Sequence, residues 1–257
     1  MSKRKFTSGL INKKVIILLF FISFLYVFNL SRIPEELTFS DMALTVLYGV
    51  NTSYSVSLVE IVKWSIPYII IIYFVGIYVE KTVLKKNLLI WMIRSRSYNK
   101  WLWEMSMNML LIITAYLISF FSFTCILSVI FSGDFSETAV FFKENNTYMS
   151  KESITQIYIL IQFLLSLTTM ALISLIQVII TICFNNSTSG MIFSIFIISM
   201  FGILSRFNII NPLMLSKCNI IDNRLEVYPS VIIIINIVLT ISIYLLLSKK
   251  IRSIIRR

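Results

Sequence analysis

The chain has 257 residues, of which 58% are hydrophobic, and its formal net charge is +11. Soluble domains contain about 45–50% apolar residues, so the excess here, concentrated in long uncharged runs, excludes a single water-soluble globular core. The sequence has no histidine and no Gly-x-x-x-x-Gly-Lys-[Ser/Thr] phosphate loop, which excludes histidine-dependent catalysis and the usual route of ATP hydrolysis within this chain.

Six charge-poor runs along the chain predict membrane-spanning helices, because about 20 helical residues cross the ~30 Å hydrocarbon layer. Within lipid the backbone must be hydrogen-bonded in a helix or a closed barrel, and these runs lack the alternation of barrel strands. We therefore predict an all-α membrane protein with six transmembrane helices in a single domain over residues 1–257. The predicted spans are residues 15–30, 58–79, 105–131, 155–184, 189–204 and 229–248.

The first predicted span follows a basic N-terminal segment. Lys13 and Lys14 extend this short span, since their aliphatic stems can reach toward the headgroups. A cleavable signal peptide is the alternative interpretation, but residues 31–33 do not form a small-x-small cleavage site. We therefore interpret the run as a retained helix.

The second predicted span carries Glu60 and Lys63 near its outer end, with Pro67 one turn further in. Lys63 is expected to extend toward the outer headgroups or to pair with Glu60 on the same helical face. A contact with substrate is the alternative role for this lysine.

No charged residue occurs between positions 153 and 205. A single helix of that length would greatly exceed the bilayer, so we predict two spans joined by a hairpin turn. The polar stretch of residues 185–190 supplies the turn, since Asn, Ser and Gly permit tight backbone bends. The long fourth span is expected to tilt or to project from the bilayer.

The distribution of charge predicts the orientation. The N-terminal segment, the 80–104 connection and the C-terminal segment carry sixteen basic and two acidic residues, against seven basic and ten acidic residues elsewhere. Short segments rich in Lys and Arg stay in the cytoplasm, so both termini are predicted to be cytoplasmic. The net charge then reflects topology, with attraction to anionic membrane lipid as a secondary effect and no nucleic acid as partner. Trp64, Trp91, Trp101 and Trp103 fall near the two predicted interfaces.

The connection between the second and third spans has its own pattern. Leu84, Leu88, Trp91 and Met92 recur at helical spacing, and most of the nearby basic residues lie off that stripe. This spacing predicts a short amphipathic cytoplasmic helix lying in the membrane interface. A solvated loop whose only role is to set the topology is the alternative.

The same connection has a recognisable order of features. Glu80 is an acid at the end of a span, and residues 88–93 form the amphipathic stretch. Arg94 or Arg96 then marks an arginine turn, and Lys100 stands before the next span. This order resembles the second cytoplasmic segment of ATP-binding-cassette (ABC) exporter permeases of the type-2 family. The chain departs from the commoner family pattern at residues 81–83, where a Gly-Thr pair is usual. The resemblance implies a coupling helix seated in a separate ATPase, with ATPase-coupling residues Glu80, Leu84, Leu88, Trp91, Met92, Arg94, Arg96 and Lys100.

The resemblance also extends to the six-span order and the basic N-terminal segment. It implies a dimer, either with a second copy or with a different permease subunit. The family carries short re-entrant helices between its last two spans, and residues 209–215 are apolar enough to enter the membrane in a similar way. Small permeases of this size resemble those of bacteriocin and lantibiotic self-protection exporters, which implies an amphiphilic substrate such as a peptide antibiotic or a lipid-like molecule.

Polar residues within the predicted spans are mostly uncharged, and Gln162, Gln177 and Asn236 are the candidates for a substrate path. Interhelical hydrogen bonding is the alternative role for these amides. No carboxylate lies deep in any span, and the three cysteines have no metal-binding spacing, so we expect no enzyme activity, no metal and no cofactor in this chain. ATP would be bound by the partner ATPase.

The sequence therefore favours a multi-pass permease of the bacterial plasma membrane. Two other functions stay open. A secondary carrier or channel would need no ATPase, although such carriers commonly place an ionisable residue at mid-membrane. A membrane assembly or sensor subunit without transport is the other.

Overall fold

The computed structural model describes residues 13–31, 38–47, 49, 58–84, 98–132, 155–205, 207, 211–214 and 229–255. Over these ranges the protein is all-α, with seven helices and no strand. Five of the helices are long and apolar enough to cross a membrane, which is the make-up of a multi-pass membrane protein. In the first helix the apolar part, Ile17–Asn29, is shorter.

Every predicted span lies within a helix, and several helices are longer than the span that they contain. Inside lipid the backbone must be hydrogen-bonded as a helix, and the polar residues at the membrane surface continue that helix. The longest, α6, begins before its predicted span, and the last one continues past it. The helices are α2 (Lys13–Leu30), α3 (Phe39–Leu47), α4 (Leu58–Val83), α6 (Tyr98–Phe131), α8 (Thr155–Phe184), α9 (Ser187–Ser205) and α11 (Pro229–Ile255).

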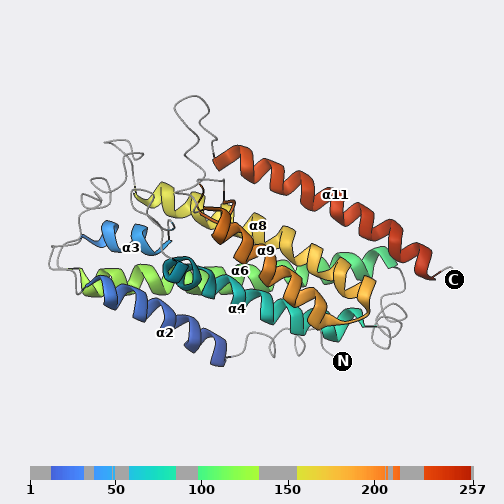
Figure 1. The fold of residues 1–257 in the computed structure, drawn as a ribbon, viewed down its shortest axis with the longest axis horizontal. Coiled ribbons are helices and arrows are strands. Elements are labelled where there is room, and N and C mark those ends of the chain that lie inside the picture. Colours follow the sequence, from blue (N-terminus) through green and yellow to red (C-terminus); the bar gives the residue numbers. More distant parts are fainter. Residues whose placement is uncertain are drawn as a thin grey trace.

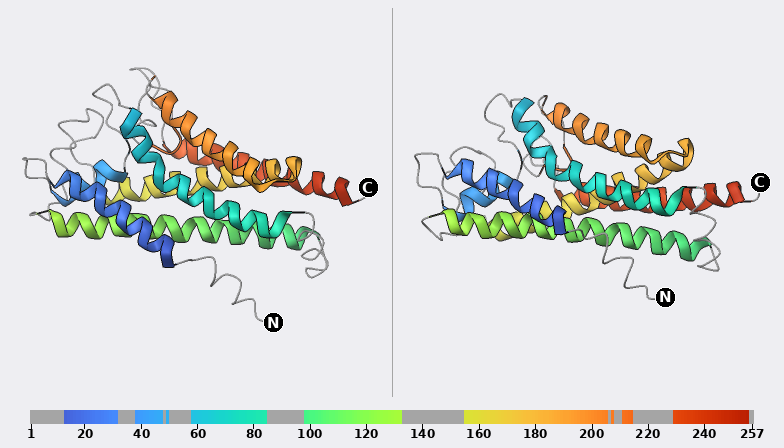
Figure 2. Two further views of the ribbon diagram at one scale, coloured as in Figure 1. Left: turned by 60° about the horizontal axis from the view of Figure 1, so that its bottom comes forward. Right: turned by 90° about the horizontal axis from the view of Figure 1, so that it is seen from below.

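The six long helices run side by side along the long axis of the molecule and alternate in direction (Figure 1). Three of them, α4, α6 and α8, pack against one another and form the centre of the bundle. Around this centre α2 packs on α6, α9 packs on both α4 and α8, and α11 packs mainly on α8 (Figure 2). The end of α4, the start of α6, the α8–α9 turn and the end of α11 lie at one end of the bundle, which we call the basic end, whereas α2 begins partway along the bundle (Figures 1 and 2).

The main core is built from the three central helices. Its fully buried large side chains include Tyr78 of α4, Tyr116 of α6 and Met170 of α8. The outward sides of the helices remain apolar as well, most clearly on α11, where Ile234, Val238 and neighbouring residues are exposed. Apolar side chains on both the inside and the outside of a helix are expected when the surrounding medium is lipid rather than water.

A short helix, α3, was not predicted from the sequence. Thr38 and Asp41 cap its first turn reciprocally: the Thr38 N–H donates to the Asp41 carboxylate at 3.2 Å, and the Asp41 N–H donates to the Thr38 hydroxyl oxygen at 3.2 Å. The helix packs against α2, α6 and α8 and buries Met42 and Leu44. It therefore fills the end of the bundle opposite the basic end (Figure 1).

The α8–α9 turn is shorter than predicted. It consists of Asn185, which has a left-handed backbone with φ 51°, and Asn186, whose side-chain oxygen accepts the Thr188 N–H at 2.9 Å. Asn tolerates the left-handed conformation that ends a helix, and an Asn side chain is a strong helix N-cap. Residues 187–190, predicted as part of the turn, are helical because this cap starts α9 at once.

Helix α9 lies very close to its two neighbours because three glycines stand at the contacts. A Cβ on Gly190 would lie 2.8 Å from the Gln177 carbonyl oxygen of α8, and a Cβ on Gly76 of α4 would collide with Met191. Gly202 makes a similar approach to Ile61. Small residues of this kind let membrane helices pack backbone to backbone.

Candidate functional site

A cluster of polar side chains lies inside the bundle between α4 and α8. On α8, Gln162 Nε2 donates to the Leu213 carbonyl oxygen at 2.7 Å and to the Ser166 hydroxyl at 3.2 Å. The Tyr68 hydroxyl of α4 lies 3.2 Å from the same Ser166 oxygen. All three polar side chains are buried. These bonds join α4, α8 and the segment that follows α9.

A second set of bonds adds α11 to this cluster. Asn236 Nδ2 of α11 donates to the Thr169 hydroxyl of α8 at 2.9 Å, and that hydroxyl donates to the Pro212 carbonyl oxygen at 2.9 Å. Thr169 and Asn236 are both buried. One hydroxyl thus connects α11 to the segment of residues 211–214.

Residues 211–214 form a tight turn inside the bundle. The Met214 N–H donates to the Asn211 carbonyl at 3.0 Å, and the Leu213 N–H donates to the Asn211 side-chain oxygen at 3.0 Å. Proline fits the second position of such a turn, and an Asn side chain at the first position commonly closes it. Leu213 and Met214 are completely buried in the main core. We call residues 211–214 the buried turn.

The sequence predicted that residues 209–215 enter the membrane-spanning part of the protein. The four of them in the buried turn pack inside the bundle, and positions 209, 210 and 215 lie outside the described residues. A turn can be buried only if its backbone oxygens find donors. Here the side chains of Gln162 and Thr169 supply those donors.

Of the three residues predicted for a substrate path, Gln162 and Asn236 belong to one bonded cluster and Gln177 does not. Gln177 lies further along α8, beside α4 and α9, where its Nε2 is 3.5 Å from the Ile72 carbonyl oxygen. Among the described residues, its Oε1 has no hydrogen-bond partner, and neither does the nearby Thr181 hydroxyl. The predicted path residues are thus divided between two places.

The geometry of the cluster favours hydrogen bonding between helices. The donors of Gln162, Thr169 and Asn236 are directed to other cluster members or to backbone oxygens of the buried turn. Such a network holds several elements in one arrangement, because each broken bond would leave a buried polar group unsatisfied. A role for these residues in a substrate path stays a prediction.

Three of the predicted ATPase-coupling residues lie at the basic end within the described part of the chain. Glu80 is exposed on α4, Leu84 is half-buried directly after α4, and Lys100 is exposed on α6. The other predicted coupling residues lie outside the described residues: Leu88, Trp91, Met92, Arg94 and Arg96.

The helix ends that flank this connection are firmly packed. Val83 at the end of α4 and Leu102 near the start of α6 are buried in the main core. Asn108 Nδ2 of α6 donates to the Tyr78 hydroxyl of α4 at 3.2 Å. The two helices that receive the 85–97 connection are therefore fixed to each other near its attachment points.

The tryptophans near the predicted interfaces differ in exposure. Trp64 is buried and packs against the Tyr68 ring, with centroids 5.1 Å apart, and Trp101 is buried in the main core. Trp103 is 59% exposed. Only Trp103, of these three, presents its indole ring to the surroundings of the bundle.

Lys63, the basic residue nearest to a predicted span interior, has an exposed side chain on α4. Within the described residues no group of three or more His, Cys, Asp or Glu side chains could hold a metal ion. Cys125 of α6 and Cys183 of α8 stand on different helices, and within the described part of the chain neither belongs to a disulfide.

Sequence reasoning missed Tyr68 and the whole of α3. Tyr68 gives no sequence signal, because its partners lie far away on α8. The start of α3 does give one, since Thr38 and Asp41 have the spacing of a reciprocal helix cap.

The comparisons identify no relative of this chain: no family model, no curated protein and no solved structure matches it. Its function is therefore inferred from its own residues.

Proposed function

We propose that this chain is the membrane-spanning permease subunit of an ABC exporter in a bacterial plasma membrane. In this proposal α2 also crosses the membrane, which brings the number of spans from five to six, and both termini are cytoplasmic. Two permease subunits, identical or different, would act with a separate ATPase that binds ATP. The substrate would be an amphiphile, such as a peptide antibiotic or a lipid-like molecule, taken from the membrane or the cell.

The observation that carries the proposal is the convergence of α4 and α6 at the basic end (Figures 1 and 2). The 85–97 connection, with most of the residues that resemble a coupling helix, is attached to these two central helices. Because Val83 and Leu102 are buried near these ends and the Asn108–Tyr78 bond joins the two helices further in, a displacement of the connection would move the helices together. The antiparallel order of the helices supports the proposal, because the end of α4, the start of α6 and the end of α11 share the basic end (Figure 1).

The test is reconstitution with an ABC ATPase encoded beside this chain. We expect a complex that hydrolyses ATP in lipid vesicles and moves an amphiphilic peptide or lipid only when ATP is present. Leu88→Ala, Trp91→Ala and Arg94→Asp should each reduce transport per ATP hydrolysed by about tenfold or more, as expected when an interface anchor is removed.

Trp103→Ala is the matched control, since it removes an exposed tryptophan at the same end of the protein but outside the connection. It should leave coupling within about twofold of the unmodified protein. Unchanged coupling in all three connection variants, or flux that follows an ion gradient without ATP, would reject the proposal.

A membrane assembly or sensor subunit is the second candidate. The bonded cluster around Gln162 favours it, because polar groups that are directed at one another do not form an open path. This candidate predicts a stable complex with a partner and no nucleotide-dependent flux in the same vesicles.

A further inference from the structure

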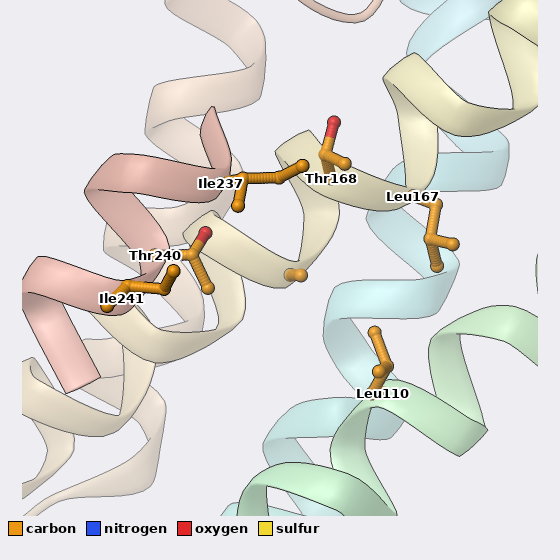
Figure 3. A pocket seen from close by; sticks show the side chains of 7 residues that line it. Leu110, Leu167, Thr168, Ile237, Thr240 and Ile241 are labelled. Atoms are coloured by element: carbon orange, nitrogen blue, oxygen red, sulfur yellow. The ribbon is translucent and has the colours of Figure 1, made fainter. Parts of the chain in front are cut away.

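An apolar groove opens between α6, α8 and α11, outside the bonded cluster (Figure 3). It encloses about 200 Å³, and its walls include Leu110 of α6, Leu167 and Ala171 of α8, and Ile237 and Ile241 of α11. All these residues are aliphatic.

The hydroxyl groups at the groove do not make it polar. Thr168 contributes to the wall, but its hydroxyl donates within its own helix, to the Leu164 carbonyl oxygen at 3.0 Å and the Leu165 carbonyl oxygen at 3.1 Å. A hydroxyl whose proton is already donated to its own helix offers little to a ligand. The groove therefore suits a hydrocarbon chain.

Two lysines lie toward the basic end on the helices that form opposite walls of the groove. On α6, Lys100 precedes Leu110 by about 15 Å of helix, and on α11, Lys249 follows Ile241 by about 12 Å, at about 1.5 Å per residue. Half of the hydrocarbon layer is about 15 Å thick. The two lysines thus lie about one lipid monolayer from the groove, and both are exposed.

We propose that the groove and the two lysines form a binding site for one anionic phospholipid. One acyl chain occupies the groove at mid-membrane depth, and the phosphate headgroup lies at the level of the Lys100 and Lys249 ammonium groups. Helix α8 forms the back of the site. The proposal rests on the chain being a membrane protein and is independent of any ATPase.

The positive charges of Lys100 and Lys249 favour an anionic phospholipid, rather than a second copy of the protein, as the occupant of this face. A second copy placed symmetrically on this face would bring its own Lys100 and Lys249 to the same depth, and like charges at close range oppose association. An anionic headgroup instead gains attraction from each lysine near the membrane surface, equivalent to about fivefold in affinity per charge.

The test is native mass spectrometry of the full chain, titrated with phosphatidylglycerol and, separately, with phosphatidylcholine. We expect one phosphatidylglycerol to be retained in preference to phosphatidylcholine. Ala171→Phe fills the groove and should weaken that retention by at least about fivefold. The pair Lys100→Gln and Lys249→Gln should weaken it by more than about tenfold.

The combined variant separates one site from two. The acyl chain in the groove and the headgroup at the two lysines belong either to one lipid molecule or to two. If they belong to one, filling the groove in the Lys100→Gln, Lys249→Gln background should add little further loss of phosphatidylglycerol binding, because the effects of interacting sites are not additive. Thr240→Phe, on the α11 wall, gives a second way to fill the groove if Ala171→Phe reduces expression.

Two controls match these changes. Val238→Phe adds the same ring to an exposed position of α11 that does not line the groove, and Lys81→Gln removes an exposed charge from α4 at the basic end. Both should bind phosphatidylglycerol within about twofold of the unmodified chain. Equal retention of the two lipids, loss from the lysine changes without loss from groove filling, or a changed oligomeric state in the groove variants with unaltered lipid retention would each overturn the proposal.

Discussion

The hydroxyl of Tyr26 on α2 donates a hydrogen bond to the backbone carbonyl of Lys63 on α4. This carbonyl is the one that Pro67 leaves without a helical partner, since proline has no N–H to donate to the residue four positions before it. In lipid there is no water to take the place of the missing donor. The bond therefore compensates for the proline and attaches α2 to the central bundle.

Replacement of Tyr26 by Phe should lower the free energy of unfolding by about 1 kcal/mol, since it leaves that carbonyl unsatisfied. In a Pro67→Ala background the same replacement should cost much less, because the introduced alanine supplies the helical N–H. Denaturant titration of the four proteins in micelles measures this coupling. Tyr73→Phe, on the exposed side of α4, is the control and should have no effect. An equal cost of Tyr26→Phe in both backgrounds would contradict the compensation.

Gln162→Leu should loosen the buried turn, because the Leu213 carbonyl loses the side-chain donor that lies 2.7 Å from it. We expect a loss of about 1–2 kcal/mol and faster hydrogen exchange at the Leu213 and Met214 amides. Gln177→Leu is a matched control on the same helix, with only a 3.5 Å contact to the Ile72 carbonyl oxygen. If both replacements cost the same, the cluster does not hold the turn.

Gly190→Ala should destabilise the bundle by about 2 kcal/mol, because the added Cβ meets the backbone oxygen of Gln177, which cannot move aside. Gly76→Ala should cost less, since its main obstacle is the flexible Met191 side chain. Met191→Ala should then restore much of the stability that the Gly76→Ala variant has lost, because it removes the side chain that the added Cβ meets. Thermal unfolding midpoints measure the order, and a greater cost for Gly76→Ala than for Gly190→Ala would show that the backbone approach is not the controlling contact.

The arrangement of the helix ends can be tested by labelling with a membrane-impermeant maleimide, in a background with Cys125, Cys183 and Cys218 changed to Ser. Asn186→Cys and Lys81→Cys should react only after the cells are permeabilised, since the α8–α9 turn and the end of α4 lie at the basic end. Phe207→Cys, exposed just beyond α9, should react in intact cells. Reaction of Asn186→Cys and Phe207→Cys from the same side would contradict the antiparallel arrangement.

The long helices could be predicted because a run without charges has few alternatives in a membrane. The helix α3 could not be predicted by the same criterion, since its nine residues are too few to span a bilayer and include the charged Asp41. That carboxylate is used in the helix cap, a local pattern that hydropathy does not register.

The candidate site was predictable in part. Gln162 and Asn236 stand out in the sequence as polar residues in apolar helices, but their partners depend on how α8 and α11 are rotated and on a turn far along the chain. Sequence spacing gives neither. The coupling role of Leu88, Trp91, Met92, Arg94 and Arg96 stays a prediction.

The two-residue link at Asn185 and Asn186 bears on how the protein enters the membrane. Neither residue is charged, and no Lys or Arg occurs anywhere in α8 or α9, so the link itself has no positive charge that would hold it in the cytoplasm during biosynthesis. With so short a link, both helices would have to leave the translocation machinery together as one hairpin. Their direction would then be inherited from the basic segments elsewhere in the chain.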